Sequence, residues 1–379
     1  MDERSRSGAG FRVGGPPRTP AKTDADARNL LADRPVLVTG ANGFVGSHLT
    51  ETLLEYGARV HAFVRATSSG LLQNIGGIKN RIVVHRGDLT DKQAVSMALK
   101  ALKADGGRPI IFHLGAQAHV GESWARPYET LASNALGTMN ILQSIVDLDL
   151  DLYRIDTAGS SEEYGNVLEE LQPFYRFDAQ GGLILDERSP LNPQSVYAAS
   201  KVATDFLTRS YQRAYGIPTV VTRMFNNYGP RQNPRFVTGT IITQALSRDT
   251  IELGYVKSKR DFCFVRDGVQ GHIHATLWGE PGDVYVYGSG SAISIADWYE
   301  LIIRIGQEEG HWKERHLQAF SGERTRHGKS EVNELRVDFG KLRGVSGWEP
   351  RYTWEQGLRE TIRWYAENPD TWVGRVDWK

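Results

Sequence analysis

Residues 36–49 read VLVTGANGFVGSHL, and this stretch decides which fold the rest of the chain must match. A short β-branched run ends in glycine, and Gly40, Gly43 and Gly46 then recur every third residue as a helical pattern begins. Glycines at this spacing allow a tight turn and let the backbone approach a pyrophosphate, which binds at the amino end of the helix. The stretch therefore predicts a dinucleotide-binding turn, provided that strands and helices alternate after it.

Short apolar runs and amphipathic stretches do alternate from Pro35 onward. They predict strands and helices at 35–40, 46–57, 59–65, 81–89, 92–104, 109–116, 132–147, 153–161, 195–216 and 218–226. Strands separated by helices are typical of right-handed βαβ units, so we expect an α/β fold with a Rossmann doubly wound parallel sheet. The alternation is lost beyond about residue 230, which predicts a smaller α/β C-terminal lobe.

We expect three parts in the chain. Residues 1–33 are rich in Gly, Pro, Arg and Asp and poor in large apolar side chains, which predicts a flexible N-terminal extension. Residues 34–230 carry the alternating pattern and form the Rossmann domain, and residues 231–379 form the C-terminal lobe. Residues 167–189 mix Gly, Gln and aromatic side chains, which predicts a loop over the strand ends.

Composition limits the classes of protein and partner. The 379 residues are 40% apolar and 24% charged, as in a soluble globular protein. With 45 basic and 45 acidic residues, the chain has no net charge to attract nucleic acid or a membrane surface. No run approaches the roughly 20 apolar residues of a membrane helix, and we expect no secretory signal. The single cysteine, Cys263, excludes a disulfide framework and is consistent with a cytoplasmic location.

The end of the second predicted strand bears on the choice of cofactor. Rossmann motifs that bind NAD have Asp or Glu about 20 residues after the glycines, whereas this chain has Arg65 in HAFVRATSS. A guanidinium suits a 2′-phosphate, with Thr67 and Ser68 as further donors, so NADP is favoured over NAD. Alternatively, Arg65 stacks on the adenine. Asp88, after the third strand, either accepts from the adenine amino group or caps a helix.

Tyr197 and Lys201 stand four residues apart in SVYAASKVATDF (195–206), so they share one face of a predicted helix. A tyrosine has an ordinary pKa of about 10, and a neighbouring ammonium stabilises the phenolate, which can then act as a base. The same spacing also occurs on solvated helices. SSEEYG (160–165), after a predicted strand, adds two hydroxyls and two carboxylates. Glu163 lies near a helix start, where the dipole favours a carboxylate, and we expect it to be structural.

Together these features resemble the extended short-chain dehydrogenase/reductase family, over about residues 35–365. Further motifs that carry the resemblance are GDLTD (87–91), FHLGAQAHVGESW (112–124), NALGTMNIL (134–142) and MFNNYGPRQ (224–232), the last being typical of the nucleotide-sugar branch. The resemblance implies that the Rossmann domain holds NAD(P) and that residues 231–379 hold a nucleoside-diphosphate hexose. It also implies a homodimer paired through helices, for which the helix bearing Tyr197 is a candidate.

The resemblance implies contacts to each ligand. The implied cofactor-binding residues are Gly40, Asn42, Gly43, Phe44, Val45, Gly46, Arg65, Asp88, Leu89, Leu114, Ala116, Gln117, Tyr197 and Lys201. The implied substrate-binding residues are His119, Asn226, Asn227, Arg231, Val237, Arg260 and Arg324. An ungapped match puts Gly328 where the family has arginine, so Arg326 or Lys329 is an alternative to Arg324. Asn134 resembles a family asparagine that braces the catalytic helix. His113 and His119 have no Cys or acidic neighbour, so we expect no metal site.

The motif at 160–165 separates activities within this branch. SSE before YG is similar to the pattern of GDP-mannose 4,6-dehydratases, with serine in place of the usual threonine. RFVTGTII (235–242) agrees, whereas NNYGPRQNP (226–234) is more similar to dTDP-glucose dehydratases. The nucleoside diphosphate of the substrate therefore stays open among GDP, UDP, dTDP and CDP. We expect a nucleotide-sugar 4,6-dehydratase, a lyase that recycles its cofactor, with a 4-ketosugar reductase or an epimerase as alternatives.

The resemblance implies a role for each catalytic residue: Ser160, Ser161, Glu162, Tyr197 and Lys201. Tyr197 removes the 4-hydroxyl proton as hydride leaves C4, while Lys201 lowers the pKa of the tyrosine and holds the nicotinamide ribose. Ser160 orients the sugar oxygen. The new 4-ketone acidifies the C5 proton, which Glu162 removes. Ser161 or Glu162 passes a proton to the departing C6 hydroxyl, and hydride returns to C6.

Overall fold

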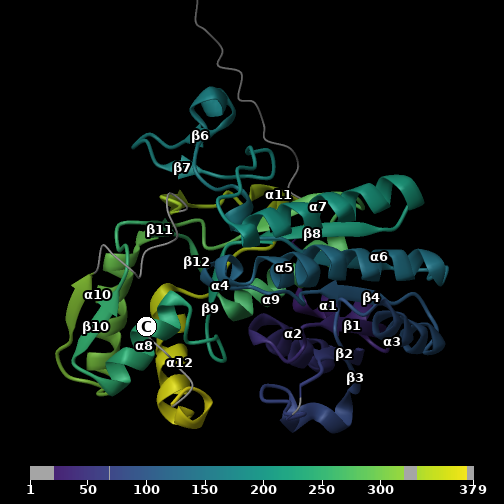
Figure 1. Cartoon of the computed structure of the whole chain (residues 1–379), viewed down its shortest axis with the longest axis horizontal. Helices are drawn as coiled ribbons and strands as arrows, with labels where there is room; N and C mark the ends of the chain where they lie inside the picture. The colour runs from purple at the N-terminus through teal and green to yellow at the C-terminus, as the bar shows by residue number, and fades with distance from the viewer. Residues whose placement is uncertain (1–20, 68, 320–330, 374–379) are drawn as a thin grey trace, which may run out of the picture.

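The computed structural model describes residues 21–67, 69–319 and 331–373 (Figure 1). Within these residues, seven parallel strands form the central sheet in the order β13-β8-β5-β4-β1-β2-β3. Their bounds are β1 Pro35–Thr39, β2 Arg59–Arg65, β3 Val83–Gly87, β4 Ile110–His113, β5 Arg154–Ala158, β8 Thr219–Met224 and β13 Val284–Tyr287. The order reverses between β1 and β4, which is the switch point where ligands bind in doubly wound sheets. The predicted α/β Rossmann fold is confirmed.

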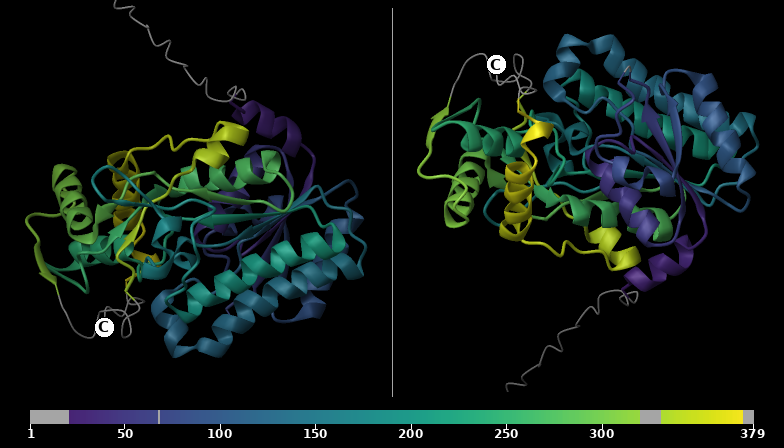
Figure 2. Two further views of the ribbon diagram at one scale, coloured as in Figure 1. Left: turned by 90° about the horizontal axis from the view of Figure 1, so that it is seen from above. Right: turned by 90° about the horizontal axis from the view of Figure 1, so that it is seen from below.

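Helices cover both faces of the sheet (Figure 2). One layer holds α1 Asp24–Leu31, α2 Phe44–Glu55, α9 Val265–Trp278 and α11 Gly340–Ser346, and the other holds α3 Lys92–Ala104, α6 Gly137–Asp147 and α7 Val196–Tyr215. Because both faces are covered, every residue of β1 is buried. Val36 and Val38 point to the core beneath α2 and α9, whereas Leu37 points to the core beneath α3 and α6.

Helix α7 begins and ends at residues whose side chains favour those positions. Ser195 Oγ accepts a hydrogen bond from the Ala198 amide at 3.1 Å and caps the amino end. Gly216 ends the helix in the left-handed conformation, with φ of +70°. The helix therefore carries Tyr197 and Lys201 in its first two turns, close to where β5 ends.

Shorter elements connect the layers. They are α4 Val120–Ala125, α5 Pro127–Leu131, the π-helical turn η2 Ala132–Leu136, the 3-10 turns η1 Gly76–Arg81, η3 Ser161–Glu163, η4 Glu169–Phe174 and η5 Pro369–Thr371, and the strand pair β6 Arg176–Phe177 and β7 Leu183–Ile184. The β6–β7 pair and η4 lie within residues 167–189 and project beyond the main body in Figure 1.

The C-terminal lobe lies beside the carboxyl ends of the strands (Figure 1). It contains α8 Val237–Ser247, α10 Ile295–Glu308 and α12 Trp354–Glu367, with short strands β9 Asn226–Tyr228, β10 Thr250–Leu253, β11 Lys259–Arg260, β12 Phe262–Phe264, β14 Ile293–Ser294, β15 His316–Ala319 and β16 Glu334–Leu335. Trp298 lies fully buried in its core, where the Phe262 ring stacks on it with centroids 4.1 Å apart. The lobe thus has its own aromatic core, distinct from the two cores of the sheet.

The structure corrects the predicted N-terminal extension. Residues 24–31 form helix α1, which Thr23 starts with a capping box, and they pack against α9. Ala27 and Leu31, one turn apart, are both fully buried, and Leu30 packs against the same core. So short an apolar face is hard to recognise in a polar sequence. The prediction of a flexible extension is therefore wrong for residues 24–31, and residues 1–20 lie outside the described part of the chain.

The structure also corrects the domain boundary at residue 230. Helix α9 packs against α2, and β13 pairs in parallel with β8 at the edge of the central sheet. Residues 265–287 therefore return from the C-terminal lobe to the Rossmann part. The sequence did not show this return, because a single helix and a single strand after a long excursion do not restore a visible alternation.

A membrane-spanning helix is absent from the described residues, since none of their helices combines the necessary length with the necessary apolar character.

Candidate active site

Three close backbone approaches shape the turn between β1 and α2. A Cβ on Gly46 would lie 2.2 Å from the Gly40 carbonyl oxygen, and one on Gly43 would lie 3.0 Å from the same atom. Gly40 itself has φ of +70°, and a Cβ there would lie 2.9 Å from Gly115 Cα. Among the described residues no side chain caps the amino end of α2, so its first-turn amides face outward from this turn. The turn has the form of a pyrophosphate cradle.

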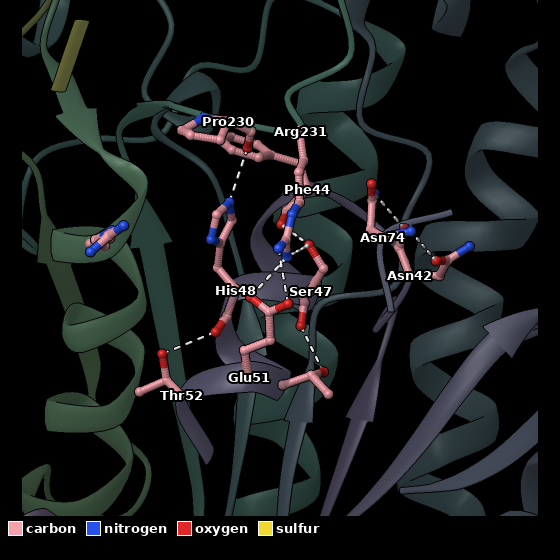
Figure 3. A network of polar contacts seen from close by, with 12 residues as sticks. Asn42, Phe44, Ser47, His48, Glu51, Thr52, Asn74, Pro230 and Arg231 are labelled. Atoms are coloured by element: carbon pink, nitrogen blue, oxygen red, sulfur yellow. Dashed lines mark hydrogen bonds and ion pairs between the residues drawn. The ribbon is translucent and has the colours of Figure 1, made fainter. Parts of the chain in front are cut away.

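The other predicted cofactor-binding residues gather at the same ends of the strands. Asn42, Phe44 and Val45 belong to the turn and the start of α2, while Leu114, Ala116 and Gln117 directly follow β4. Asn42 anchors the turn from outside, because its Oδ1 accepts from the Asn74 amide at 3.0 Å (Figure 3). Leu89, after β3, is nearly buried. The sequence therefore placed this set at the switch point of the sheet.

Arg65 ends β2 and Asp88 follows β3, so the two meet at the edge of the cradle. Arg65 Nε lies 3.7 Å from Asp88 Oδ2, and the arginine side chain is 83% exposed. Thr90 donates both its amide and its hydroxyl to Asp88 Oδ1, and the amide bond is the largest cause that lowers the pKa of Asp88. Helix α3 is capped by Asp91, so the alternative that Asp88 caps this helix is wrong.

The predicted catalytic residues converge between β5 and α7. Ser160 caps the η3 turn by accepting from the Glu162 amide at 3.2 Å, and its side chain also hydrogen-bonds Tyr197. Lys201 Nζ donates to the Ala158 carbonyl oxygen at 2.7 Å. Ser161 lies in the same η3 turn and is buried, as are the other four. Helix α7 is thus joined to the chain after β5 at two points, Ala158 and Ser160.

Burial dominates the acid–base properties of this cluster. It raises the pKa of the Tyr197 phenol; the bond with Ser160 opposes the shift, and the charge of Glu162 adds to it. Burial lowers the pKa of Lys201 to about 8, and Glu163 opposes this shift. Burial, and to a smaller extent the charge of Lys201, lowers the pKa of His113 to about 3, so this imidazole is neutral. The phenolate therefore requires positive charge nearby.

Glu163 differs from Glu162 in its partners. Its Oε1 accepts from the Ser160 amide at 2.7 Å, which completes a capping box, and its Oε2 lies 3.3 Å from Arg223 Nε. Sequence reasoning missed Arg223 and its second partner, Asp205. A signal was present, because a charged residue inside the apolar run PTVVTRMFN (218–226) needs a buried counter-charge.

Asn134 links the strand ends to the catalytic helix. It lies in the π-helical turn η2; its Oδ1 accepts from the Gln117 amide at 2.7 Å, and its Nδ2 donates to Ser200 Oγ at 2.8 Å. π-Helical turns occur frequently at functional sites. The asparagine thus braces α7 next to Lys201, in the position that the sequence resemblance implied for it.

The predicted substrate-binding residues divide into two groups. His119 caps α4 through Nδ1, Asn226 lies on β9, and Val237 begins α8, so these residues come from elements of both lobes. Asn227 instead turns toward α9, since a Cβ on Gly268 would lie 2.5 Å from its Oδ1. Arg260 is buried and donates to the Val332 carbonyl oxygen at 2.8 Å. Arg324 lies outside the described residues.

Arg231 has partners on α2 that the sequence did not indicate (Figure 3). Its two terminal nitrogens each lie 2.9 Å from a carboxylate oxygen of Glu51 on α2, and Nη1 also reaches Ser47 Oγ at 3.3 Å. The adjacent Pro230 carbonyl oxygen lies 3.0 Å from His48 Nε2 on the same helix. Arg231 is also one of three non-glycine residues with positive φ in the described chain, at +69°. The structure therefore uses Arg231 to join the two lobes, and its contact with substrate stays a prediction.

Comparison with known proteins agrees with this geometry. The family model described as GDP-mannose 4,6 dehydratase matches residues 37–361. The dTDP-glucose 4,6-dehydratase of Xanthomonas campestris pv. campestris is 28% identical over 90% of this chain and 95% of its own length. A GDP-mannose 4,6-dehydratase of Sordaria araneosa is 30% identical over 86% of this chain and 60% of its own length. The structure of DesIV, a dTDP-glucose 4,6-dehydratase of Streptomyces venezuelae with NAD bound, has a TM-score of 0.76 and 26% identity over 89% of this chain and 99% of its own.

The joining role of Arg231 predicts a measurable coupling with Glu51. In a double-mutant cycle of Arg231→Met and Glu51→Gln, urea unfolding should give a coupling free energy of about 1 kcal/mol, the upper range for a part-exposed, bidentate pair. Arg235→Met is the matched control, because Arg235 lies 3.8 Å from Glu122 and is 49% exposed; it should change stability little. A coupling of zero would mean that the pair does not join the two lobes.

Proposed function

The chain belongs to the GDP-mannose 4,6-dehydratase family, and we propose that it converts a nucleoside-diphosphate hexose into the 4-keto-6-deoxyhexose with loss of water. The observation that carries the proposal is the position of Glu162, a buried carboxylate whose charge acts on Tyr197. Exchange of hydride at C4 alone needs only the Tyr–Lys pair. A second base beside that pair suits removal of the C5 proton, which only elimination requires.

At C4, the chain supplies a base and an orienting hydroxyl. Ser160, which hydrogen-bonds Tyr197, holds the 4-hydroxyl oxygen, and Tyr197 accepts its proton as hydride leaves C4. Lys201 holds its ammonium against the Ala158 carbonyl oxygen and favours the phenolate by its charge. The product of this step is a 4-ketone, and its formation makes the neighbouring C5 proton acidic.

At C5 and C6, the motif after β5 supplies the remaining proton transfers. Glu162 removes the C5 proton, and Glu162 or Ser161 delivers a proton to the C6 hydroxyl, which departs as water. Hydride is regained at C6 and a proton at C5, so the sugar is rearranged with no net oxidation. Because both residues lie in the buried η3 turn, water from outside competes poorly for these protons.

The cradle between β1 and α2 fits a dinucleotide, since its glycines leave room that any Cβ would fill. When bound, the oxidised dinucleotide supplies the hydride acceptor and the positive charge that the buried phenol lacks. Arg65 supports NADP over NAD, because its exposed guanidinium can pair with a 2′-phosphate. Its present partner, Asp88, is held mainly by Thr90 and constrains the arginine little.

The two parts of the chain hold different ligands. Residues 34–230 with 265–287 and 340–346 hold the dinucleotide, and the rest of 231–379 holds the sugar nucleotide, whose nucleoside diphosphate is one of GDP, UDP, dTDP or CDP. A 4-ketosugar reductase or an epimerase is the second candidate, because each uses the same Tyr–Lys pair. A cytoplasmic location is supported by the single cysteine, Cys263, which is buried.

We also propose a homodimer paired through α7 and its neighbours. Apolar side chains are unusually exposed along α4, α5, α6 and α7: Trp124, Tyr128, Leu131, Met139 and Phe206, with Tyr128 85% and Phe206 50% exposed. Monomeric proteins rarely expose a continuous apolar patch of this kind. Helices α4 and α5 both pack on α7, and these helices lie along one outer face of the molecule in Figure 2.

The dehydratase proposal predicts loss of 18 mass units from one member of a panel of GDP-, UDP-, dTDP- and CDP-hexoses, without net change at the nicotinamide absorbance band. Glu162→Gln should lower the yield of this product by about 10²-fold or more, the typical worth of a general base. The reduced-nicotinamide band should then appear and persist, because C4 oxidation still proceeds. Tyr197→Phe is the matched control and should lose both signals. Unchanged turnover in Glu162→Gln would contradict the mechanism.

The cofactor proposal predicts a selective effect of Arg65→Ala. The dissociation constant for NADP⁺ should rise about tenfold or more, with a much smaller change for NAD⁺, as measured by titration calorimetry, because one charge-assisted contact is lost. Arg108→Ala removes the same charge beside Asp151, at the opposite ends of the strands, and should change neither constant. Equal weakening of both cofactors would mean that Arg65 stacks on the adenine instead.

The dimer proposal predicts a particle of twice the 42.3 kDa chain mass in light scattering after size exclusion. The double variant Tyr128→Glu/Phe206→Glu should elute as a folded monomer, because two charges would be buried without partners at the interface. Phe174→Glu is the control, since Phe174 is 68% exposed and belongs to η4, outside the four helices of the proposed interface. A monomeric parent protein would rule the proposal out.

A further inference from the structure

We propose that Glu163 is a positioning residue of the reaction: its carboxylate holds the backbone between the two contacts of the Tyr–Lys pair and keeps the Lys201 side chain cationic. This inference rests on the proposed function and goes beyond it, because the C5 base and the C4 base are other residues. It also changes the expectation that Glu163 is merely structural.

The first observation is where the Glu163 carboxylate lies. Lys201 binds the carbonyl oxygen of Ala158, and Tyr197 bonds the side chain of Ser160. Between these two contact points, Glu163 Oε1 accepts from the Ser160 amide at 2.7 Å. A Cβ on Gly159 would lie 2.6 Å from the same oxygen, so the glycine makes room for the carboxylate. One carboxylate therefore fixes the three-residue segment that both catalytic side chains use.

The second observation is a chain of charges that leads away from this carboxylate. Arg223 Nε lies 3.3 Å from Glu163 Oε2, and Arg223 Nη2 lies 2.7 Å from Asp205 Oδ2. Asp205 Oδ1 in turn lies 2.5 Å from Arg209 Nε. Glu163 and Asp205 are fully buried, Arg223 is 3% exposed, and Arg209 reaches the surface of α7 with 21% exposure. The network thus runs from the catalytic segment to solvent.

This network limits the protonation of a buried carboxylate. Burial raises the pKa of Glu163 to about 7, while the Arg223 guanidinium and the Ser160 amide oppose that rise, so the carboxylate carries its charge above this pH. Arg223 also donates to the Tyr164 hydroxyl at 3.0 Å, which fixes its orientation. Two carboxylates and two guanidiniums alternate along the network, so Arg223 and Asp205 each lie between charges of opposite sign and Glu163 ends the chain beside Arg223. An alternating arrangement of this kind is what makes ion pairs tolerable inside a protein.

The charge of Glu163 acts on the groups around Lys201. Those groups are the phenol of Tyr197 on α7, the imidazole of His113 on β4, the Ala158 carbonyl on β5, and Glu163 itself. His113 is neutral, because its pKa is lowered to about 3. Among the described residues, Glu163 is therefore the charged group that favours the ammonium of Lys201 against its burial. A cationic Lys201 is what the Tyr197 phenolate needs.

The substitution that isolates this charge is Glu163→Gln. Glutamine has the same shape, and its Oε1 can still accept from the Ser160 amide, so the backbone bond is retained while the charge is removed. Arg223 keeps Asp205 as a partner, which limits the loss of stability. Glu163→Asp retains the charge on a shorter side chain and serves as the conservative variant.

The expected result is a shift of the pH–rate profile. Without the carboxylate, Lys201 loses its proton at lower pH, so the fall of kcat on the alkaline side should move to lower pH by about one unit or more, the usual effect of one nearby charge. Tyr197 also loses the repulsion of Glu163, so the acid side should move in the same direction. Glu163→Asp should restore the parent profile even if its rate is reduced.

Asp205→Asn is the matched control for stability. It removes a charge from the same network but lies beyond Arg223, so it should lower the denaturation midpoint at least as much as Glu163→Gln. The acid and alkaline sides of its pH–rate profile should nevertheless stay at the same pH as in the parent protein. If both variants shift the profile equally, or if neither does, the effect is one of general stability and the inference is wrong.

A titration without turnover separates this inference from the proposed function. In protein carrying [ε-¹³C]lysine, the resonance that disappears in Lys201→Met reports the protonation of Lys201 directly. Its titration midpoint should lie about one unit lower in Glu163→Gln than in the parent, and close to the parent in Glu163→Asp. An unmoved midpoint would overturn the inference even in a fully active dehydratase. A moved midpoint would support it even if no hexose of the panel were dehydrated.

Discussion

The hydrogen bond from Lys201 to the carbonyl oxygen of Ala158 is the contact on which the site depends. At 2.7 Å it ties helix α7 to the end of strand β5. The bond between Tyr197 and Ser160 ties the same helix to the chain two residues after Ala158. Because both contacts use a three-residue segment, any displacement of that segment moves the two catalytic side chains together. Gly159 permits this arrangement by leaving space for the carboxylate behind it.

Two further constraints place this segment relative to the ligands. The glycines between β1 and α2 allow backbone contacts too close for any side chain, which brings the cofactor cradle to the switch point of the sheet. Arg231 then binds Glu51 on α2, in a backbone conformation that few side chains adopt, and so joins the C-terminal lobe to the cradle helix. The cofactor helix and the substrate lobe are thereby held together by a charged pair.

Features that depend on local sequence were predictable, and features that depend on distant partners were not. The glycine turn, the helices α2, α3, α6 and α7, and six of the seven strands of the central sheet follow from periodicity and spacing, and the structure confirms the resulting fold. Helix α1 was missed because only Ala27 and Leu31 of its eight residues are buried, and β13 because its pairing with β8 joins residues about sixty positions apart. The pairing of Arg231 was missed because its partner, Glu51, lies on another element.

The sequence by itself determined which chemical groups are present and how they are spaced along the chain. Tyr197 and Lys201 share a helix face because four residues make about one turn, and the motif SSEEYG follows a strand. Only the tertiary structure separated the two carboxylates of that motif. Glu163 meets Arg223 from β8 and is held in a buried charge network, whereas Glu162 lies beside the phenol. Neighbours in sequence have nearly the same local pattern, so their roles are decided by which distant charges the fold brings to each.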